Sequence, residues 1–490
     1  MFDSQFYRRS WFAVPLLVLI FPVAAQSLRV QCPSSTNLHP AVAPTVANPS
    51  GANPAIKCQQ IAGGDGYATM ADGTQTYLFG FGPLSGMDLI NAGLPGTQSA
   101  GDFNKPYNSP VFPGVDASNG NATVPDTTFN PAMPTNTNGA VLDPAEMVNV
   151  GVLSAQHPAP MMAIDEDDEF FLTLSNVGQI MRPDLFEQHT VHFHGYPNAA
   201  PYFDGVPDAS VAINISGSMT YYYTAPDAGT YFWHCHITPP EHLQMGMVGQ
   251  LYVRPRQNRV PSGASLYAAA ATRPCAASDI LCASPLPIVN NGVTQPANGA
   301  KYAYNDGDGS TRYDVEYPIQ MMGFDPNFHY ISMTFNPGDF SGMKDKYYML
   351  GGRGYPDTVN PASIATQSSD GLTRPSQPQP MLITINKTGG QTRALLRISN
   401  LSVTEFNTLA TIGIPMQVVA LDARLLRDAA GNNLYYDTNS ITIGGGSTVD
   451  VILDATNIPV GTYFLYTTNL DHLSNDNENF GGMMTEIAIQ

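Results

Sequence analysis

Metal-binding side chains are concentrated in two short stretches of this sequence, "HTVHFHG" and "TYFWHCHITPPEHLQMGM". Ten histidines occur in the whole chain, and six of them lie in these two stretches together with one cysteine and a methionine. The candidate ligands are His189, His192, His194, His234, Cys235, His236, His242 and Met247. Imidazole, thiolate and thioether groups at this density predict a metal centre.

The alternation of side chains in a strand arranges these residues on two faces. His192 and His194 project to one face, and His234 and His236 form a second pair of the same kind. Neighbouring strands lie about 4.8 Å apart, so two such pairs on adjacent strands bring four imidazoles around one small volume. Cys235 points the opposite way from its two neighbours.

On its own face, Cys235 could meet a second set of ligands consisting of His189, His242 and Met247. Two imidazoles, one thiolate and a weak axial thioether describe a blue-copper electron-transfer centre. Zinc is the alternative metal, but it explains neither the methionine nor the four remaining histidines.

The rest of the sequence predicts an all-β scaffold for these ligands. The chain has 490 residues with 44 Gly and 41 Pro, and only 12% of its residues are charged, which indicates many turns and few long surface helices. Short aromatic and β-branched runs separated by Gly, Pro, Asp and Asn are typical of β-sandwich domains.

The composition divides the chain into five parts. We predict a signal peptide at 1–25, an extended arm at 26–60, a ligand-bearing β-domain at 61–255 with a loop-rich insertion at 82–158, a linker at 256–312 and a second β-domain at 313–490. Arg8 and Arg9 precede an apolar run shorter than the ~20 residues of a spanning helix, so secretion is favoured over a membrane anchor. A periplasmic or secreted protein is expected.

The five cysteines fit an oxidising compartment. Pairing of Cys32 with Cys58 and of Cys275 with Cys282 would leave Cys235 free for a metal. The formal charge of −19 makes nucleic acid and anionic membrane surfaces poor partners. Cations and neutral or cationic substrates remain possible partners.

The second β-domain repeats the first without its ligands. Aligning Gly195 with Gly413 places three neutral residues opposite His189, His192 and His194, and these residues are Asn407, Ala410 and Ile412. Aligning Gly229 with Gly461 does the same for His234, Cys235 and His236, whose counterparts are Tyr466, Thr467 and Thr468. The histidines are therefore not required by the scaffold.

The two ligand stretches resemble the copper-binding signature of multicopper oxidases, and "GGRGYPDTV" and "LRISNLSVTEFN" resemble the copper-free middle domain of such enzymes. The resemblance implies an all-β fold of two cupredoxin-like Greek-key β-sandwich domains with long loop insertions. It also implies a copper oxidoreductase that passes electrons from a small-molecule or metal-ion donor, near His242, to oxygen.

Carried over by position, the resemblance implies a type 1 copper ligand set of His189, Cys235, His242 and Met247. It assigns His192 to a type 2 copper and three further histidines to a type 3 pair, namely His194, His234 and His236. Cys235, His234 and His236 would then be catalytic, as the covalent path for electrons between the two centres.

Two departures from the family pattern leave alternatives open. "TPPE" lengthens the loop before His242, which we expect to carry the solvent-exposed ligand. The chain also offers only two His-x-His pairs where a complete cluster takes four. A homo-oligomer could complete the cluster; a copper nitrite reductase-like site could take a third ligand from His329 or His472; or the chain could be a type 1 electron carrier or structural cupredoxin.

The remaining charged and histidine residues near the motifs receive no site role. His39 and His157 are interpreted as ordinary surface or loop residues. The acidic residues Glu187, Asp204 and Glu241 could bind a cationic donor or feed protons, but surface solvation is the default for each of them.

Overall fold

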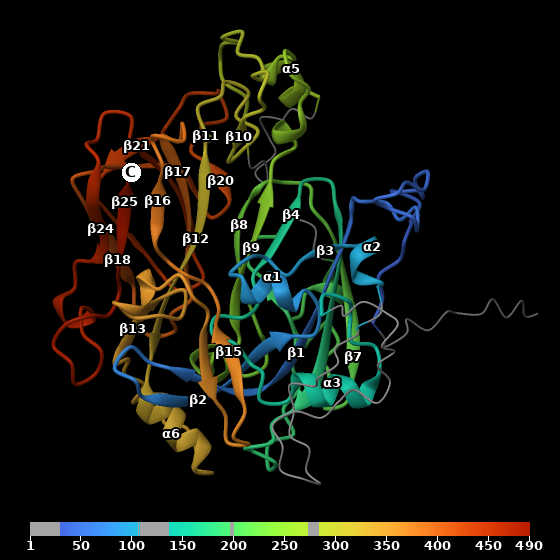
Figure 1. Ribbon diagram of the computed structural model, residues 1–490, viewed down its shortest axis with the longest axis vertical. Coiled ribbons are helices and arrows are strands. Elements are labelled where there is room, and N and C mark those ends of the chain that lie inside the picture. The colour runs from blue at the N-terminus through green and yellow to red at the C-terminus, as the bar shows by residue number, and fades with distance from the viewer. Residues whose placement is uncertain (1–29, 106, 108–136, 197–199, 273–283) are drawn as a thin grey trace, which may run out of the picture.

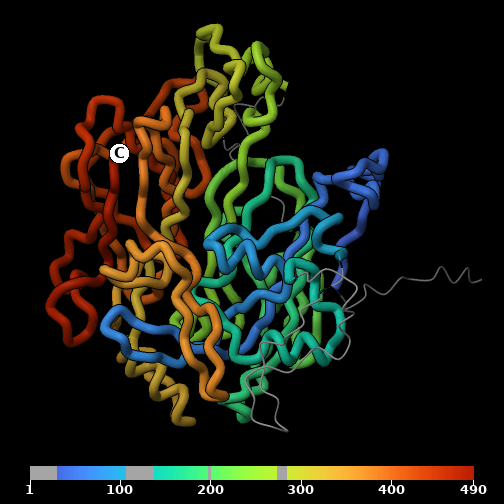
Figure 2. Tube along the Cα trace, viewed as in Figure 1, coloured from blue at the N-terminus to red at the C-terminus, as the bar shows by residue number. Residues whose placement is uncertain are grey.

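The computed structural model describes residues 30–105, 107, 137–196, 200–272 and 284–490. The predicted signal peptide and the predicted Cys275–Cys282 pair lie outside these residues. The described chain forms two β-rich halves that lie side by side, the N-terminal half coloured blue to green and the C-terminal half orange to red (Figure 1, Figure 2).

The N-terminal half is a sandwich of two sheets. One sheet has the order β2-β1-β5-β7 with β3 paired to β1, and the other has the order β4-β9-β8-β6. The strand bounds are β1 Ile56–Thr69, β2 Gln75–Pro83, β3 Gln98–Ser99, β4 Met162–Asp165, β5 Glu169–Gly178, β6 His192–Phe193, β7 Ser218–Thr224, β8 Gly229–His234 and β9 Val248–Arg254. Ile61, Leu172 and Trp233 are fully buried between the sheets and form the core.

The C-terminal half is a second sandwich. Its sheets have the orders β13-β12-β17-β23-β19-β20, with β21 paired to β19, and β16-β25-β24-β18-β22. The bounds are β12 Val315–Phe324, β13 Tyr347–Leu350, β16 Ile383–Ile385, β17 Arg393–Asn400, β18 Asn407–Ile412, β19 Met416–Leu421, β20 Arg424–Leu425, β21 Tyr436–Thr438, β22 Ser440–Ile443, β23 Thr448–Asp454, β24 Gly461–Thr467 and β25 Met484–Ile489. Leu396, Val451 and Leu465 lie in its core.

Short elements connect the strands. The pairs β10 Lys301–Tyr302 with β11 Arg312–Tyr313 and β14 Ile364–Gln367 with β15 Thr373–Gln377 are small hairpin-like ladders. The helices are α1 Met87–Asn91, α2 Ala100–Phe103, α3 Pro144–Gly151, α4 Pro239–Met245, α5 Leu266–Ala270 and α6 Pro326–Met333, with 3-10 turns at Pro201–Phe203, Arg256–Arg259, Asp357–Val359 and Leu470–His472. None of the helices in the described part of the chain has the length and apolar character needed to span a membrane.

The N-terminal arm is attached to the first sandwich by a disulfide and by polar contacts. Cys32 and Cys58 are bonded, as expected. The Thr36 hydroxyl and the His39 ring both contact the buried Glu169 carboxylate, the His39 contact at 2.8 Å. Strand β1 begins at Ile56, inside the range predicted to be an extended arm, because residues from Ile56 onward pair in parallel with β5.

The two halves share a buried interface. Strand β8 is buried along its whole length because β17 and β23 of the second half cover its outer side. A second apolar cluster contains Phe232 of the first half and Phe324 of the second. Below it, helix α6 lies against β2 (Figure 1). The halves therefore pack as one body around the ends of β2, β8 and α4.

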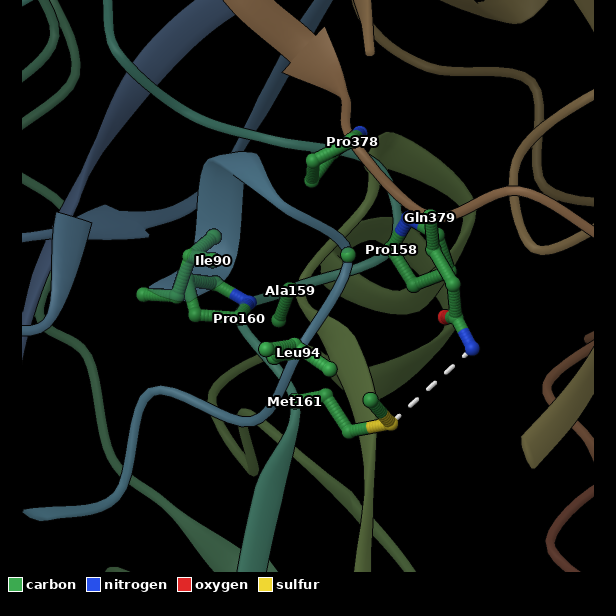
Figure 3. Close-up of a pocket in the computed structure, with 9 residues that line it drawn as sticks. Ile90, Leu94, Pro158, Ala159, Pro160, Met161, Pro378 and Gln379 are labelled. Carbon is green, nitrogen blue, oxygen red and sulfur yellow. Dashed lines mark hydrogen bonds between the residues drawn. The ribbon is translucent and has the colours of Figure 1, made fainter. Parts of the chain in front are cut away.

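A small apolar pocket marks another junction between the halves (Figure 3). Ile90 and Leu94, from α1 and the turn after it, face Met161 and the 378–379 segment. The Gln379 side-chain amide contacts the Met161 sulfur at 3.9 Å. The pocket is lined by apolar side chains and one amide, so we assign it to packing rather than to chemistry.

Candidate metal centres

The strand register places two groups of ligands on opposite faces of β6 and β8. His192 pairs with His234, and Phe193 pairs with Trp233. Phe193 and Trp233 are in the apolar core, so the two histidines face outward. Cys235 belongs to that core, as strand alternation predicts. The first domain thus carries an outer histidine group and an inner thiolate group, separated by one strand.

The outer group brings imidazole nitrogens together. Ligand atoms of His192, His194 and His234 all lie within 4.8 Å of one another, and the Nε2 atoms of His194 and His234 are 2.9 Å apart. The His236 ring is 5.1 Å from the His192 ring and 5.5 Å from the His234 ring, between centroids. Beside His194 lies a cavity of about 270 Å³ whose walls include Thr448 of the second half.

Backbone carbonyls fix the orientation of these rings. The Nδ1 atom of His192 donates to the Asp204 carbonyl oxygen at 2.7 Å, and that of His234 donates to the Cys235 carbonyl oxygen at 2.6 Å. A carbonyl can only accept, so each ring carries its proton on Nδ1 and presents a lone pair at Nε2. Burial lowers the pKa of His234 to about 3, which keeps the ring in the neutral, metal-binding form.

The second half holds His194 in place. The Gly446 backbone hydrogen-bonds its ring, and a Cβ atom at Gly446 would lie 2.8 Å from the ring atoms Nδ1 and Cε1. Gly446 also has a φ of +85°. Only glycine allows this approach without strain. Sequence reasoning missed Gly446 because its contact is made across the interface and leaves no local pattern.

The inner group is fully enclosed. His189, Cys235 and His242 have no exposed surface, and the Cys235 Sγ atom is 3.3 Å from Nδ1 of His242 and 4.0 Å from Nδ1 of His189. The Thr190 N–H donates to the same sulfur at 3.4 Å. Met247 is also fully buried, and its N–H donates to the His242 carbonyl at 2.8 Å.

Electrostatics favour a thiolate at Cys235. Burial raises the pKa of this thiol, but the neighbouring rings of His242 and His189 lower it well below its usual range. Conversely, burial lowers the pKa of His242, whereas Cys235 and Glu187 raise it, to about 9. A thiolate next to two imidazoles is the soft donor set that binds copper.

The expected exposure of His242 is wrong. The "TPPE" stretch lies at the start of helix α4 instead of extending an open loop. His242 lies in this helix, and its ring is 0% exposed and packs against Phe79 and His189. The Nε2 atom of His242 lies 3.5 Å from the carboxylate of Glu187, whose side chain is 25% exposed. Glu187, whose default interpretation from the sequence is surface solvation, therefore contacts an inner ligand and also reaches the surface.

The other histidines do not join either group. His329 is fully buried with both ring nitrogens near backbone carbonyls, and the His472 ring contacts Glu405 at 2.9 Å and stacks on Tyr348. His157 was expected to be an ordinary loop or surface residue, but its side chain is fully buried because β-rich segments of both halves enclose it.

The second half reproduces the strand pairing of the first without the ligands. Ala410 pairs with Tyr466 across β18 and β24, just as His192 pairs with His234 across β6 and β8. The internal alignment from the sequence has the same register. Ile412, the counterpart of His194, is 59% exposed. The corresponding positions of the second half therefore carry neutral side chains and no imidazole or thiolate group.

Comparison with known proteins agrees with this geometry. Two family models described as multicopper oxidase match residues 135–258 and 330–487. The chain belongs to the multicopper oxidase family. It is 32% identical to the multicopper oxidase MCE of Talaromyces pinophilus over 108 residues, and 32% identical to laccase abr2 of Aspergillus fumigatus over 109 residues. Each match covers 22% of this chain but only 16% and 17% of the respective relatives.

Solved structures extend the similarity in fold to most of the chain. The blue copper oxidase from Nitrosomonas europaea matches with a TM-score of 0.50 and 17% identity, covering 88% of this chain and 85% of that one. The multicopper oxidase mgLAC matches with a TM-score of 0.50 and 15% identity, covering 88% and 86%. The predicted all-β, cupredoxin-like fold is confirmed.

Copper is the cofactor that membership of the multicopper oxidase family implies, and the side chains fit it. At the outer group, the Nε2 atoms of His194 and His234 lie 2.9 Å apart, close enough for both to bind one cation. At the inner group, two imidazoles and a thiolate converge beside a buried methionine. Soft sulfur stabilises Cu(I), and imidazole suits Cu(II).

Proposed function

We propose that this multicopper oxidase takes single electrons from a reducing substrate and passes them to oxygen. The type 1 ligands in this proposal are His189, Cys235, His242 and Met247. The oxygen-reducing cluster uses His192, His194, His234 and His236. The observation that carries the proposal is the position of Cys235, whose side chain lies in the inner group while both of its neighbours lie in the outer group.

This adjacency supplies a covalent electron path. Copper, when bound, provides one-electron redox chemistry at each group. The chain provides the connection, because the Cys235 backbone joins the inner sulfur directly to His234 and His236. The Cys235 carbonyl also accepts the proton of His234 Nδ1, so the same residue orients a ligand of the outer group.

The outer group supplies half of a cluster, so we propose that a homo-oligomer completes it. The partly exposed His192 and His194 are available to a partner chain. A nitrite reductase-like site with a third ligand from the same chain fits less well. Both ring nitrogens of His329 are engaged, and the His472 ring is buried against Tyr348 and Glu405.

The electron donor is proposed to approach at Glu187. Its carboxylate contacts the otherwise enclosed His242 ring, and Glu241 lies nearby on α4. With a net charge of −19, the chain attracts cationic donors more strongly than neutral ones. A metal ion or a cationic organic reductant is therefore the proposed donor class.

We propose a periplasmic or secreted location. The Cys32–Cys58 disulfide supports it, because such bonds persist in oxidising compartments. The charged N-terminal residues and the apolar run after them add to this support.

The deciding experiment measures copper per chain, optical and paramagnetic-resonance spectra, solution mass and oxygen uptake in the copper-loaded protein. We expect more than one copper per chain, type 1 and type 2 signals and an oligomer. The His236→Ala variant should keep its blue absorption and lose oxygen uptake, since only the outer group is damaged. Unchanged oxygen uptake in this variant contradicts the proposal, and a single blue copper per chain points to an electron carrier instead.

A further inference from the structure

The segment between the two inner ligands His242 and Met247 is held by residues of the second half. Gln244 lies in this segment and is fully buried. Its side-chain oxygen accepts from the Asp325 N–H at 3.1 Å, and its side-chain amide donates to Asp345 at 2.9 Å. These two contacts cross the interface between the sandwiches.

His329 adds a third contact to the same residue. Its Nε2 atom lies 2.9 Å from the Gln244 carbonyl oxygen, and its Nδ1 atom lies 2.6 Å from the carbonyl oxygen of Tyr77 on β2. The ring stacks on Phe324 with centroids 3.6 Å apart. Since His329 sits on α6, the second half reaches both the ligand segment and the strand that supports it.

The strand contacted by His329 also touches an inner ligand. Phe79, two residues after Tyr77 on β2, packs edge-on against the His242 ring with centroids 5.2 Å apart. His329 thus contacts the main chain on two sides of the inner group, and because burial lowers its pKa, the neutral ring has one N–H and donates to one of the two carbonyls at a time. Buried polar contacts of this kind define one geometry because an unsatisfied carbonyl is costly in the interior.

We propose, on the basis of the proposed function, that His329 is a positioning residue for the type 1 site. His329, Asp325 and Asp345 all contact Gln244. These contacts hold the segment between His242 and Met247 in one conformation and so fix the spacing of the two ligands. The second half has lost its own ligands but sets the ligand geometry of the first. The second half restrains the inner site through its hydrogen bonds to Gln244 in the 242–247 segment.

A matched pair of variants tests this role. His329→Phe keeps a ring against Phe324 and removes both polar contacts. His157→Phe is the control, because His157 is equally buried and flanks the same Phe324 ring, but its ring nitrogens have no hydrogen-bond partner among the described residues. His329→Gln keeps a side-chain donor and should restore part of the wild-type behaviour.

The first measurement needs no copper. Hydrogen exchange of the metal-free protein should show the amides of residues 242–247 exchanging about tenfold faster in His329→Phe, as expected when a supporting hydrogen bond is lost. The same amides should be unchanged in His157→Phe. Equal exchange in His329→Phe and wild type overturns the proposal.

The second measurement uses the copper-loaded protein. His329→Phe should show an altered ratio of charge-transfer bands and about tenfold faster copper release to a chelator, as is found when support behind a ligand is removed. If the wild type shows no type 1 spectrum, the proposed function fails. If the wild-type spectrum is present and His329→Phe matches it in bands and release rate, only the positioning role fails.

Discussion

At the scale of single residues, Glu187 connects the buried inner group to the protein surface. The His242 ring is enclosed, and the partly exposed Glu187 carboxylate lies 3.5 Å from its Nε2 atom. A carboxylate in this position both orients the ring and presents negative charge to a donor. A variant that removes the charge but keeps a polar side chain distinguishes orientation of the ring from attraction of the donor.

The Glu187→Gln variant is expected to raise KM for a cationic donor about tenfold, because an attractive charge next to the electron-entry ligand is lost. The KM for a neutral phenolic donor should change little. Steady-state kinetics with one donor of each class measures the difference. Glu478→Gln, on the exposed surface of the second half, is the charge-matched control. A rise in KM of equal size for both donors contradicts a charge-based role.

At the scale of elements, the turn between β22 and β23 supports the outer group. Gly446 approaches the His194 ring so closely that an added Cβ atom lies 2.8 Å from it. The Gly446→Ala variant is expected to displace His194, so that copper at the outer group and oxygen uptake fall while the blue absorption of the inner group persists. Copper analysis together with the two spectra follows both groups at once.

Backbone strain alone cannot produce that pattern, and a second glycine provides the control. Gly390 has the same φ of +85° with nothing within 4 Å of an added Cβ atom. Gly390→Ala should cost stability of about 1 kcal/mol from backbone strain and leave both copper signals intact. Loss of outer copper in both variants would show that strain, and not contact with His194, is responsible.

The alternation of side chains along the ligand strands could be predicted from the sequence alone. The alternating pairs at 192–194 and 234–236 predict the two faces correctly, because the two-residue period of a strand is a local property. The internal repeat aligns Ala410 and Tyr466 with His192 and His234, and the structure pairs them as it pairs the two histidines.

Contacts across the interface could not be predicted in this way. His329 meets Gln244 across 85 positions and Tyr77 across 252, and no periodicity links such distant residues. The burial of His242 was missed because the longer "TPPE" stretch was interpreted as an extended loop that carries an exposed ligand. These residues instead begin helix α4, where proline is well tolerated in the first turn.

At the scale of the whole molecule, a buried ionic network joins the two halves. Glu316 on β12 contacts Arg254 on β9 at 2.9 Å and the fully buried Arg397 on β17 at 3.0 Å. Burial raises the pKa of Glu316, but the two guanidinium groups outweigh it and lower the pKa to about 2. The folded pKa is thus below the usual 4.5.

Because folding lowers the pKa of Glu316, the free energy of unfolding depends on pH. The stabilisation by Glu316 is fully present above about pH 4.5 and is lost as the pH falls towards 2. Glu316→Gln is expected to cost about 3 kcal/mol at pH 7, because it removes the carboxylate that pairs with the fully buried Arg397 and the partly exposed Arg254. Its stability should also depend less on pH below 4.5 than that of the wild type.

Denaturant unfolding between pH 3 and 7 measures both effects. The exposed pair of Lys105 with Asp102 serves as the control, and Asp102→Asn should cost less than about 1 kcal/mol. A Glu316→Gln variant with wild-type stability at pH 7 would show that the network contributes nothing net to the association of the halves.

The carbonyl groups behind the outer histidines bear on the order in which the protein matures. The acceptors for His192 and His234 belong to the main chain, so we expect the fold itself to align the rings. Small domains that fold only around their metal have no such prior alignment. Here chain folding and formation of the Cys32–Cys58 bond can both precede copper delivery. We therefore expect metal loading to be the last step of maturation.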